Sequence, residues 1–150
     1  MPPRVLVPPE DVTITVGLDR LLYLVDTRLR HVAAYAVDGS VAACWALRPP
    51  EGTGEVEAVA VNGDGTLFAL AEIGGLPNVL RAARGARLEP FIGLEAPQHQ
   101  KLGSFAHFLA VANDGRIYVA AGLDSLRVFD PAGQLLWSSA AIRRAAAGSG

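Results

Sequence analysis

The sequence has a single cysteine and a single methionine, and it has no long apolar run. Cys44 has no second cysteine to pair with, which is typical of a reducing compartment, so we expect a cytoplasmic location. A membrane-spanning helix needs about 20 consecutive apolar residues, and a secretory leader needs an apolar core that the first residues do not contain. The sequence therefore predicts no membrane partner and no leader.

Charge of one sign is not in excess either. There are 13 basic and 15 acidic residues, which leaves a net charge of −2. Nothing in this balance indicates a nucleic acid or an anionic membrane as a partner. Hydrophobic residues make up 51% of the chain and charged residues 19%, which excludes disorder for most of it. A length of 150 residues predicts one domain with a substantial core.

Residues 108–137 have the pattern of four short strands joined by three turns. An apolar segment is followed by Asp114-Gly115, a dipeptide that supplies the positive φ angles of a tight hairpin. Residues 116–121 (RIYVAA) are rich in β-branched and aromatic side chains, and residues 126–130 (LRVFD) alternate apolar and polar with period 2. A Pro-Ala-Gly turn then leads into a last short strand.

Two earlier segments, residues 56–91 and 12–45, repeat this order. Asp64-Gly65 and, more weakly, Asp19-Arg20 stand where the later unit has Asp-Gly. The glycines of the second turn recur at intervals of 46 and 48 residues: Gly39, Gly85 and Gly133. A period in the forties with four strands per unit is typical of propeller blades, and a β-sandwich with similar hairpins is the alternative fold.

These motifs resemble the blades of NHL-type and gluconolactonase-like six-bladed propellers. Such blades read as an apolar strand, Asp-Gly, (I/L)YV, a short loop, (V/L)xVFD and xGxxL. The matching segments are DGRIYVAAGLDSLRVFDPAGQLL at residues 114–136 and, in looser form, DGTLFALAE at residues 64–72. The resemblance spans residues 12–139 and implies a propeller fold. It says little about function, because propellers host unrelated activities.

The predicted organisation is an all-β, single half-propeller domain over residues 1–147, built from three four-stranded antiparallel blades. The pattern SSAAIRRAAA, with a serine cap before good helix formers, predicts a short C-terminal helix. The blades are expected at residues 12–46, 56–94 and 106–139, the helix at 138–147 and a flexible tail at 148–150.

Three blades do not close a ring, since closed propellers have roughly 4–8 blades. An open stack of three would leave a hydrophobic face bare at each end. We therefore expect a homodimer in which each chain forms half of a six-bladed ring, with a large apolar interface. The alternatives are a trimer of nine blades, a partner protein that supplies the missing blades, and a fragment of a longer chain.

A ligand site is expected at the rim formed by the blade connectors and the loops between second and third strands. Glu57 and His107 each precede the first-turn glycine of their unit by eight residues, which places both near the channel mouth. Histidine and carboxylates there could hold a divalent metal. The Glu, Asn and Asp set of the calcium site in lactonase-like propellers has no match here, so solvated polar residues are the simpler interpretation and no cofactor is assigned. The candidate rim residues are Glu57, His107, Glu72, Asp124, Asp26 and His31.

No catalytic constellation is recognisable, because the histidines are scattered and neither a nucleophile elbow nor a phosphate loop is present. The favoured function is therefore a non-enzymatic binding or scaffold module that self-assembles and offers a rigid rim to a protein or small ligand. One alternative is a metal-dependent lactonase or esterase-like hydrolase with its site at the channel. A purely structural, designed or excised half-propeller is the other.

Overall fold

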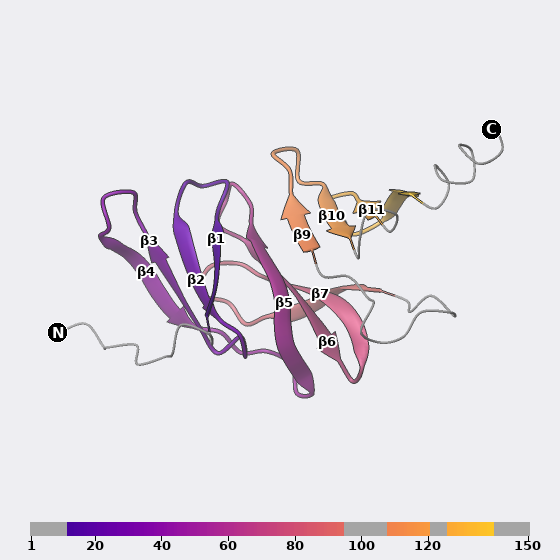
Figure 1. Cartoon of the computed structure of the whole chain (residues 1–150), viewed down its shortest axis with the longest axis horizontal. Coiled ribbons are helices and arrows are strands. Elements are labelled where there is room, and N and C mark those ends of the chain that lie inside the picture. The colour runs from indigo at the N-terminus through magenta and orange to yellow at the C-terminus, as the bar shows by residue number, and fades with distance from the viewer. Residues whose placement is uncertain (1–11, 95–107, 121–125, 140–150) are drawn as a thin grey trace.

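The computed structural model describes residues 12–94, 108–120 and 126–139, which form three antiparallel sheets of four strands each (Figure 1). In every sheet, strands that follow one another in sequence are neighbours. This meander is the expected blade, and the all-β prediction of three four-stranded blades is confirmed. The first sheet contains β1 (Val12–Val16), β2 (Leu22–Asp26), β3 (His31–Tyr35) and β4 (Val41–Ala46). The second contains β5 (Thr53–Val61), β6 (Leu67–Ile73), β7 (Leu76–Ala82) and β8 (Glu89–Gly93). The third contains β9 (Phe108–Val111), β10 (Ile117–Ala120), β11 (Leu126–Phe129) and β12 (Leu135–Ser138).

The first turn of each sheet is closed in the same way by an aspartate. Its carboxylate accepts a hydrogen bond from the backbone N–H two residues later, an arrangement that short acidic side chains favour in turns. The expectation that the Asp-Gly turns at Asp64 and Asp114 are structural is confirmed. The three bonds run from Leu21 to Asp19 at 3.1 Å, from Thr66 to Asp64 at 2.9 Å and from Arg116 to Asp114 at 3.0 Å.

The residue after the aspartate has a left-handed backbone in all three turns. Gly65 and Gly115 adopt it with φ of 86° and 87°. Arg20 stands at the same place in the first sheet with φ of 70°. A residue with a Cβ pays roughly 1–2 kcal/mol for this conformation, so the first turn of the first sheet is strained where its two counterparts are not.

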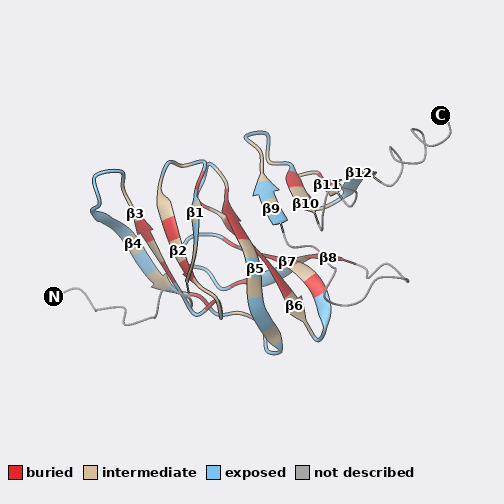
Figure 2. Cartoon of the chain, in the orientation of Figure 1, coloured by how far each residue is buried: buried red, intermediate tan, exposed pale blue. Residues whose placement is uncertain are grey.

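The sheets are stacked face to face, with the second sheet in the middle (Figures 1 and 2). Because side chains alternate along a strand, β6 buries Leu67 and Ala69 toward the first sheet and Phe68 and Leu70 toward the third. Every residue from Leu67 to Ala71 is buried. Two separate apolar cores result, one on each face of the second sheet.

The first strands of the three sheets lie next to one another, with β5 between β1 and β9 (Figure 1). Two backbone hydrogen bonds tie the first sheet to the second. The N–H of Leu18 donates to the carbonyl of Val61 at 3.0 Å, and the N–H of Val56 donates to the carbonyl of Thr27 at 2.7 Å. Radial sheets joined at their first strands are the arrangement of a propeller.

Element boundaries differ from the expected ones in two places. β5 begins at Thr53, three residues before the predicted start of the second blade. Ser138, the expected first residue of a C-terminal helix, belongs to β12, and residues 140–150 lie outside the described part of the chain. Among the residues that the structure describes, no helix has the length and apolar character needed to cross a membrane.

Candidate functional site

Two of the expected rim residues flank one hairpin of the first sheet. Asp26 ends β2 and His31 begins β3. The carboxylate of Asp26 accepts a hydrogen bond from the N–H of Arg28 at 2.8 Å, and its carbonyl accepts one from the N–H of Leu29 at 2.7 Å. Asp26 therefore shapes the hairpin, which leaves its second carboxylate oxygen for other contacts.

Glu57 lies at an irregularity in β5. Val56 pairs with Ala71 and Ala58 pairs with Leu70, so Glu57 is an additional residue in its strand. A bulge of this kind redirects the side chain at the point where it occurs. Glu57 is exposed on the first strand of the middle sheet.

The remaining rim candidates are not gathered into one group. Glu72 shares a face of β6 with Phe68 and Leu70, toward the third sheet, whereas Asp26 lies on the first sheet. His107 and Asp124 fall outside the described residues. Within the described ranges, no three His, Cys, Asp or Glu side chains are placed to share a metal ion. The rim site remains a prediction.

The sheet faces show a clearer pattern. We call the face that packs on the preceding sheet the rear face and the face that packs on the following sheet the front face. The rear face of the second sheet lies in the core shared with the first sheet, and the rear face of the third sheet lies against the core shared with the second. The residues that define these rear faces are Val59, Val61, Leu67 and Ala69 in the second sheet, and Leu109, Val111, Ile117 and Val119 in the third.

The rear face of the first sheet has the same apolar character, but none of the sheets in the described residues packs on it. Ile14 pairs with Leu24 and Val16 pairs with Leu22, as Val59 pairs with Ala69 in the second sheet. Ile14 is 60% exposed and Val16 is 71% exposed. The first sheet thus presents the surface that the other two sheets bury.

The front face of the third sheet is exposed in part: Val128, which pairs with Tyr118 on this face, is fully buried, whereas other residues of the face are not. Tyr23, Phe68 and Tyr118 are each the second residue of the second strand of their sheet. Tyr23 and Phe68 are buried against the next sheet, while Tyr118 is only partly buried. Phe108 of the same face is 63% exposed. Figure 2 shows β9 coloured as exposed at the far side of the second sheet from β1.

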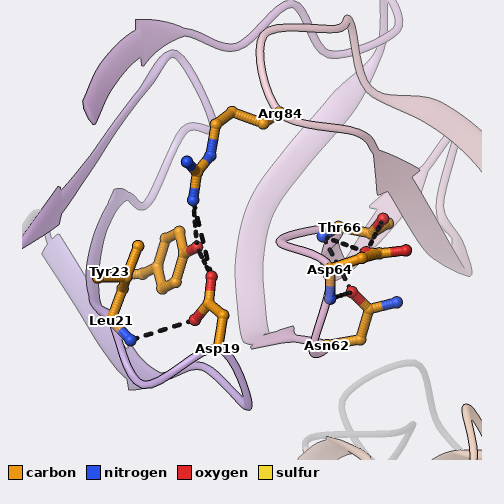
Figure 3. Close-up of polar contacts among 7 residues, drawn as sticks. All are labelled: Asp19, Leu21, Tyr23, Asn62, Asp64, Thr66 and Arg84. Atoms are coloured by element: carbon orange, nitrogen blue, oxygen red, sulfur yellow. Dashed lines mark hydrogen bonds and ion pairs between the residues drawn. The ribbon is translucent and has the colours of Figure 1, made fainter. Parts of the chain in front are cut away.

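A polar link joins the first two sheets beside their apolar core (Figure 3). The hydroxyl of Tyr23 donates a hydrogen bond to Asp19 Oδ2 and accepts one from Arg84 Nη2 at 3.2 Å. Arg84 Nη2 also lies 3.7 Å from Asp19 Oδ2, and its guanidinium lies 5.7 Å from the ring centre of Trp45. Burial, followed by the hydrogen bond to Asp19, raises the pKa of Tyr23. Arg84 of the second sheet therefore fastens the first sheet in place.

The corresponding aspartate of the second sheet makes only local bonds (Figure 3). Asp64 Oδ1 accepts hydrogen bonds from the Thr66 hydroxyl at 2.6 Å and from the Thr66 N–H at 2.9 Å. These bonds, the hydroxyl first, lower the pKa of Asp64. Asp19 and Asp64 thus close the same turn in their sheets, but of the two only Asp19 also takes part in a link between sheets.

The sequence matches no family model and no curated protein. Solved structures do match, at low sequence identity. A catalytically inactive virginiamycin B lyase from Staphylococcus aureus with quinupristin has a TM-score of 0.57 and 13% identity, over 89% of this chain and 42% of that one. A streptogramin B lyase has a TM-score of 0.55 and 16% identity, over 87% of this chain and 41% of that one. YCF48 bound to D1 peptide has a TM-score of 0.51 and 14% identity, over 89% of this chain and 42% of that one.

These neighbours are β-propeller proteins, and the likeness shows that this chain has a propeller fold. The chain spans less than half the length of each of them. Kinship with the NHL-type or gluconolactonase-like group in particular remains a prediction from the sequence motifs. The matches are consistent with a partial propeller, in agreement with the three stacked sheets.

Proposed function

We propose that this protein is a non-enzymatic binding and scaffold module that self-assembles into a closed propeller. Two copies supply six blades, so each chain is half of the ring. The closed ring then offers a rigid rim, on which Glu57 lies, to a protein or small ligand. Cys44 has no cysteine to pair with in its own chain, and we place the assembly in the cytoplasm.

The observation that carries this proposal is the pair of apolar end faces. Ile14 and Val16 at one end and Phe108 at the other are each at least 60% exposed. Contiguous apolar surface of this kind marks an interaction site in a soluble protein. Both faces have the apolar pattern that packs against a neighbouring sheet inside the chain. The blades of another copy are therefore the partner that fits them best.

The mass in solution tests the proposal. Chromatography with light scattering at two protein concentrations should give twice the mass of the 15.7 kDa chain at the higher concentration. Association of this type depends on concentration, so dilution should favour the single chain. A single-chain mass at both concentrations would overturn the closed ring. A mass of three chains would replace the dimer with the nine-bladed trimer.

A further inference from the structure

We infer that the copies associate head to tail, with the rear face of the first sheet in one copy packed on the front face of the third sheet in the next. This inference rests on the proposed self-assembly and specifies its partner surface. In this contact Tyr118 packs against the next copy in the way that Tyr23 packs against the second sheet within one chain. The alternatives are a symmetric contact between two rear faces and one between two front faces.

The first argument is continuity with the contacts inside the chain. The same pattern of rear-face residues packs on a preceding front face twice, in the second sheet and again in the third. Ile14 and Val16 repeat this pattern in the first sheet, at the positions of Val59 and Val61. Within one chain, a rear face of this kind packs on a front face twice. The rear face of the first sheet is therefore suited to pack on the front face of another copy.

The second argument is closure. A head-to-tail contact between two half-rings occurs twice in the closed dimer, and it covers both bare faces of both copies. A contact between two rear faces leaves Phe108 and Tyr118 uncovered in each copy. A contact between two front faces leaves Ile14 and Val16 uncovered. Head-to-tail association is the arrangement in which no apolar end face stays in water.

The junction between copies also differs from the internal one in a defined way. Asp114 and Tyr118 stand in the third sheet where Asp19 and Tyr23 stand in the first. Arg84 lies two residues beyond the end of β7, and the residue two beyond the end of β3 is Val37. Val37 is 92% exposed. The junction between copies therefore has Asp114 and Tyr118, the counterparts of Asp19 and Tyr23, but Val37 stands where the internal junction has the cation Arg84.

Two variants separate the arrangements. Val16→Glu places a charge on the rear face, and Phe108→Glu places one on the front face. Both side chains are largely exposed within one chain, so the fold should be retained, and circular dichroism checks this point. Leu76→Glu is the matched control, since Leu76 is a 55% exposed apolar residue of the middle sheet that lies on neither end face.

The readout is the mass of each variant alone and of an equal mixture of the two. Head-to-tail association predicts a single-chain mass for Val16→Glu and for Phe108→Glu, and recovery of the two-chain species on mixing, because one intact rear face then meets one intact front face. Leu76→Glu should keep the mass of the unmodified protein. If only Val16→Glu dissociates, the contact is rear to rear, and if only Phe108→Glu dissociates, it is front to front. Either pattern overturns the head-to-tail inference and the closed ring but leaves self-association standing, whereas an unmodified protein that is already a single chain overturns self-association as well.

Discussion

Arg84 Nη2 lies 3.2 Å from the hydroxyl of Tyr23, although the two residues are 61 positions apart in the chain. The bond crosses from the second sheet to the first, beside the core that the two sheets share. A charged donor on a buried phenol holds the sheets in one register, whereas apolar packing alone would tolerate small shifts.

Replacement of Arg84 tests the value of this link. Arg84→Ala removes the hydrogen bond to Tyr23 and the contact with Asp19, and should lower the free energy of unfolding by about 1 kcal/mol, since the arginine is partly exposed and screened. Urea denaturation at one fixed protein concentration measures the change. Arg116→Ala is the matched control, because Arg116 contacts Asp114 at 3.4 Å within its own hairpin. An equal loss in both variants would argue against a special role for the link.

Alkaline stability should depend on Tyr23. Burial raises the pKa of Tyr23, whereas a tyrosine in the unfolded chain ionises near pH 10. The stabilisation from the protonated phenol is therefore fully present below about pH 10 and is lost as the pH rises through the higher folded value. Tyr23→Phe has no proton to lose, so its unfolding midpoint should fall less between pH 9 and 11. Parallel curves for the two proteins would contradict this prediction.

The strained turn of the first sheet offers a stabilising change. Arg20→Gly should raise the free energy of unfolding by about 0.5–1 kcal/mol, because glycine adopts a φ of 70° without a Cβ clash but loses more chain entropy on folding. Gly115→Ala is the opposite test. Its Cβ would lie 2.9 Å from Pro131 Cγ at a φ of +87°, so it should destabilise by at least 1 kcal/mol. Thermal unfolding of both variants at equal concentration measures the pair, and a loss in Arg20→Gly would refute the assignment of strain.

Val37→Arg should strengthen the association of copies. The substitution supplies a cation at the place that Arg84 holds in the internal junction, facing Asp114 and Tyr118 of the next copy. A charge-assisted hydrogen bond at this contact should lower the dissociation constant by roughly tenfold. Sedimentation across a dilution series measures the constant. Glu51→Gln is the control for the added positive charge, since it also raises the net charge by one and Glu51 is an exposed residue of the connector between the first two sheets. A similar gain in both variants would point to net charge instead of the junction.

Much of the fold follows from local signals in the sequence. The expected strands of the third unit coincide with β9 to β12 to within two residues at each end, because Asp114-Gly115 and the alternation of LRVFD act over a few neighbouring positions. The stacking of the units also follows from the repeat, since every unit carries the same apolar pattern. β5 begins at Thr53, whereas the sequence predicts a start at residue 56, because the prolines and glycines of residues 48–54 (RPPEGTG) have the composition of a loop.

The polar link was not predictable in the same way. Arg84 reads from the sequence as one of several arginines on a solvated hairpin, and Tyr23 reads as one more aromatic residue of a strand. Only the packing of two sheets brings them together, and that packing depends on the register of side chains far apart in the chain. Their one sequence signal is that Tyr23 carries a hydroxyl where the second unit has Phe68. The rim candidates have no equivalent support. Asp26 and His31 flank one hairpin of the first sheet, Glu57 and Glu72 lie on two strands of the second, and the other two candidates lie outside the described residues.

The irregular pairing of third and fourth strands has a consequence for the behaviour of the protein at high concentration. The register shifts between Ala34 and Tyr35 in the first sheet, between Val79 and Leu80 in the second, and between Val128 and Phe129 in the third. Each shift bends the outermost strand, whose unpaired edge would otherwise be a template for a strand from another molecule. Fibrillar growth from the sheet edges is thereby disfavoured, so in a crowded solution contacts between sheet faces are favoured over contacts between sheet edges.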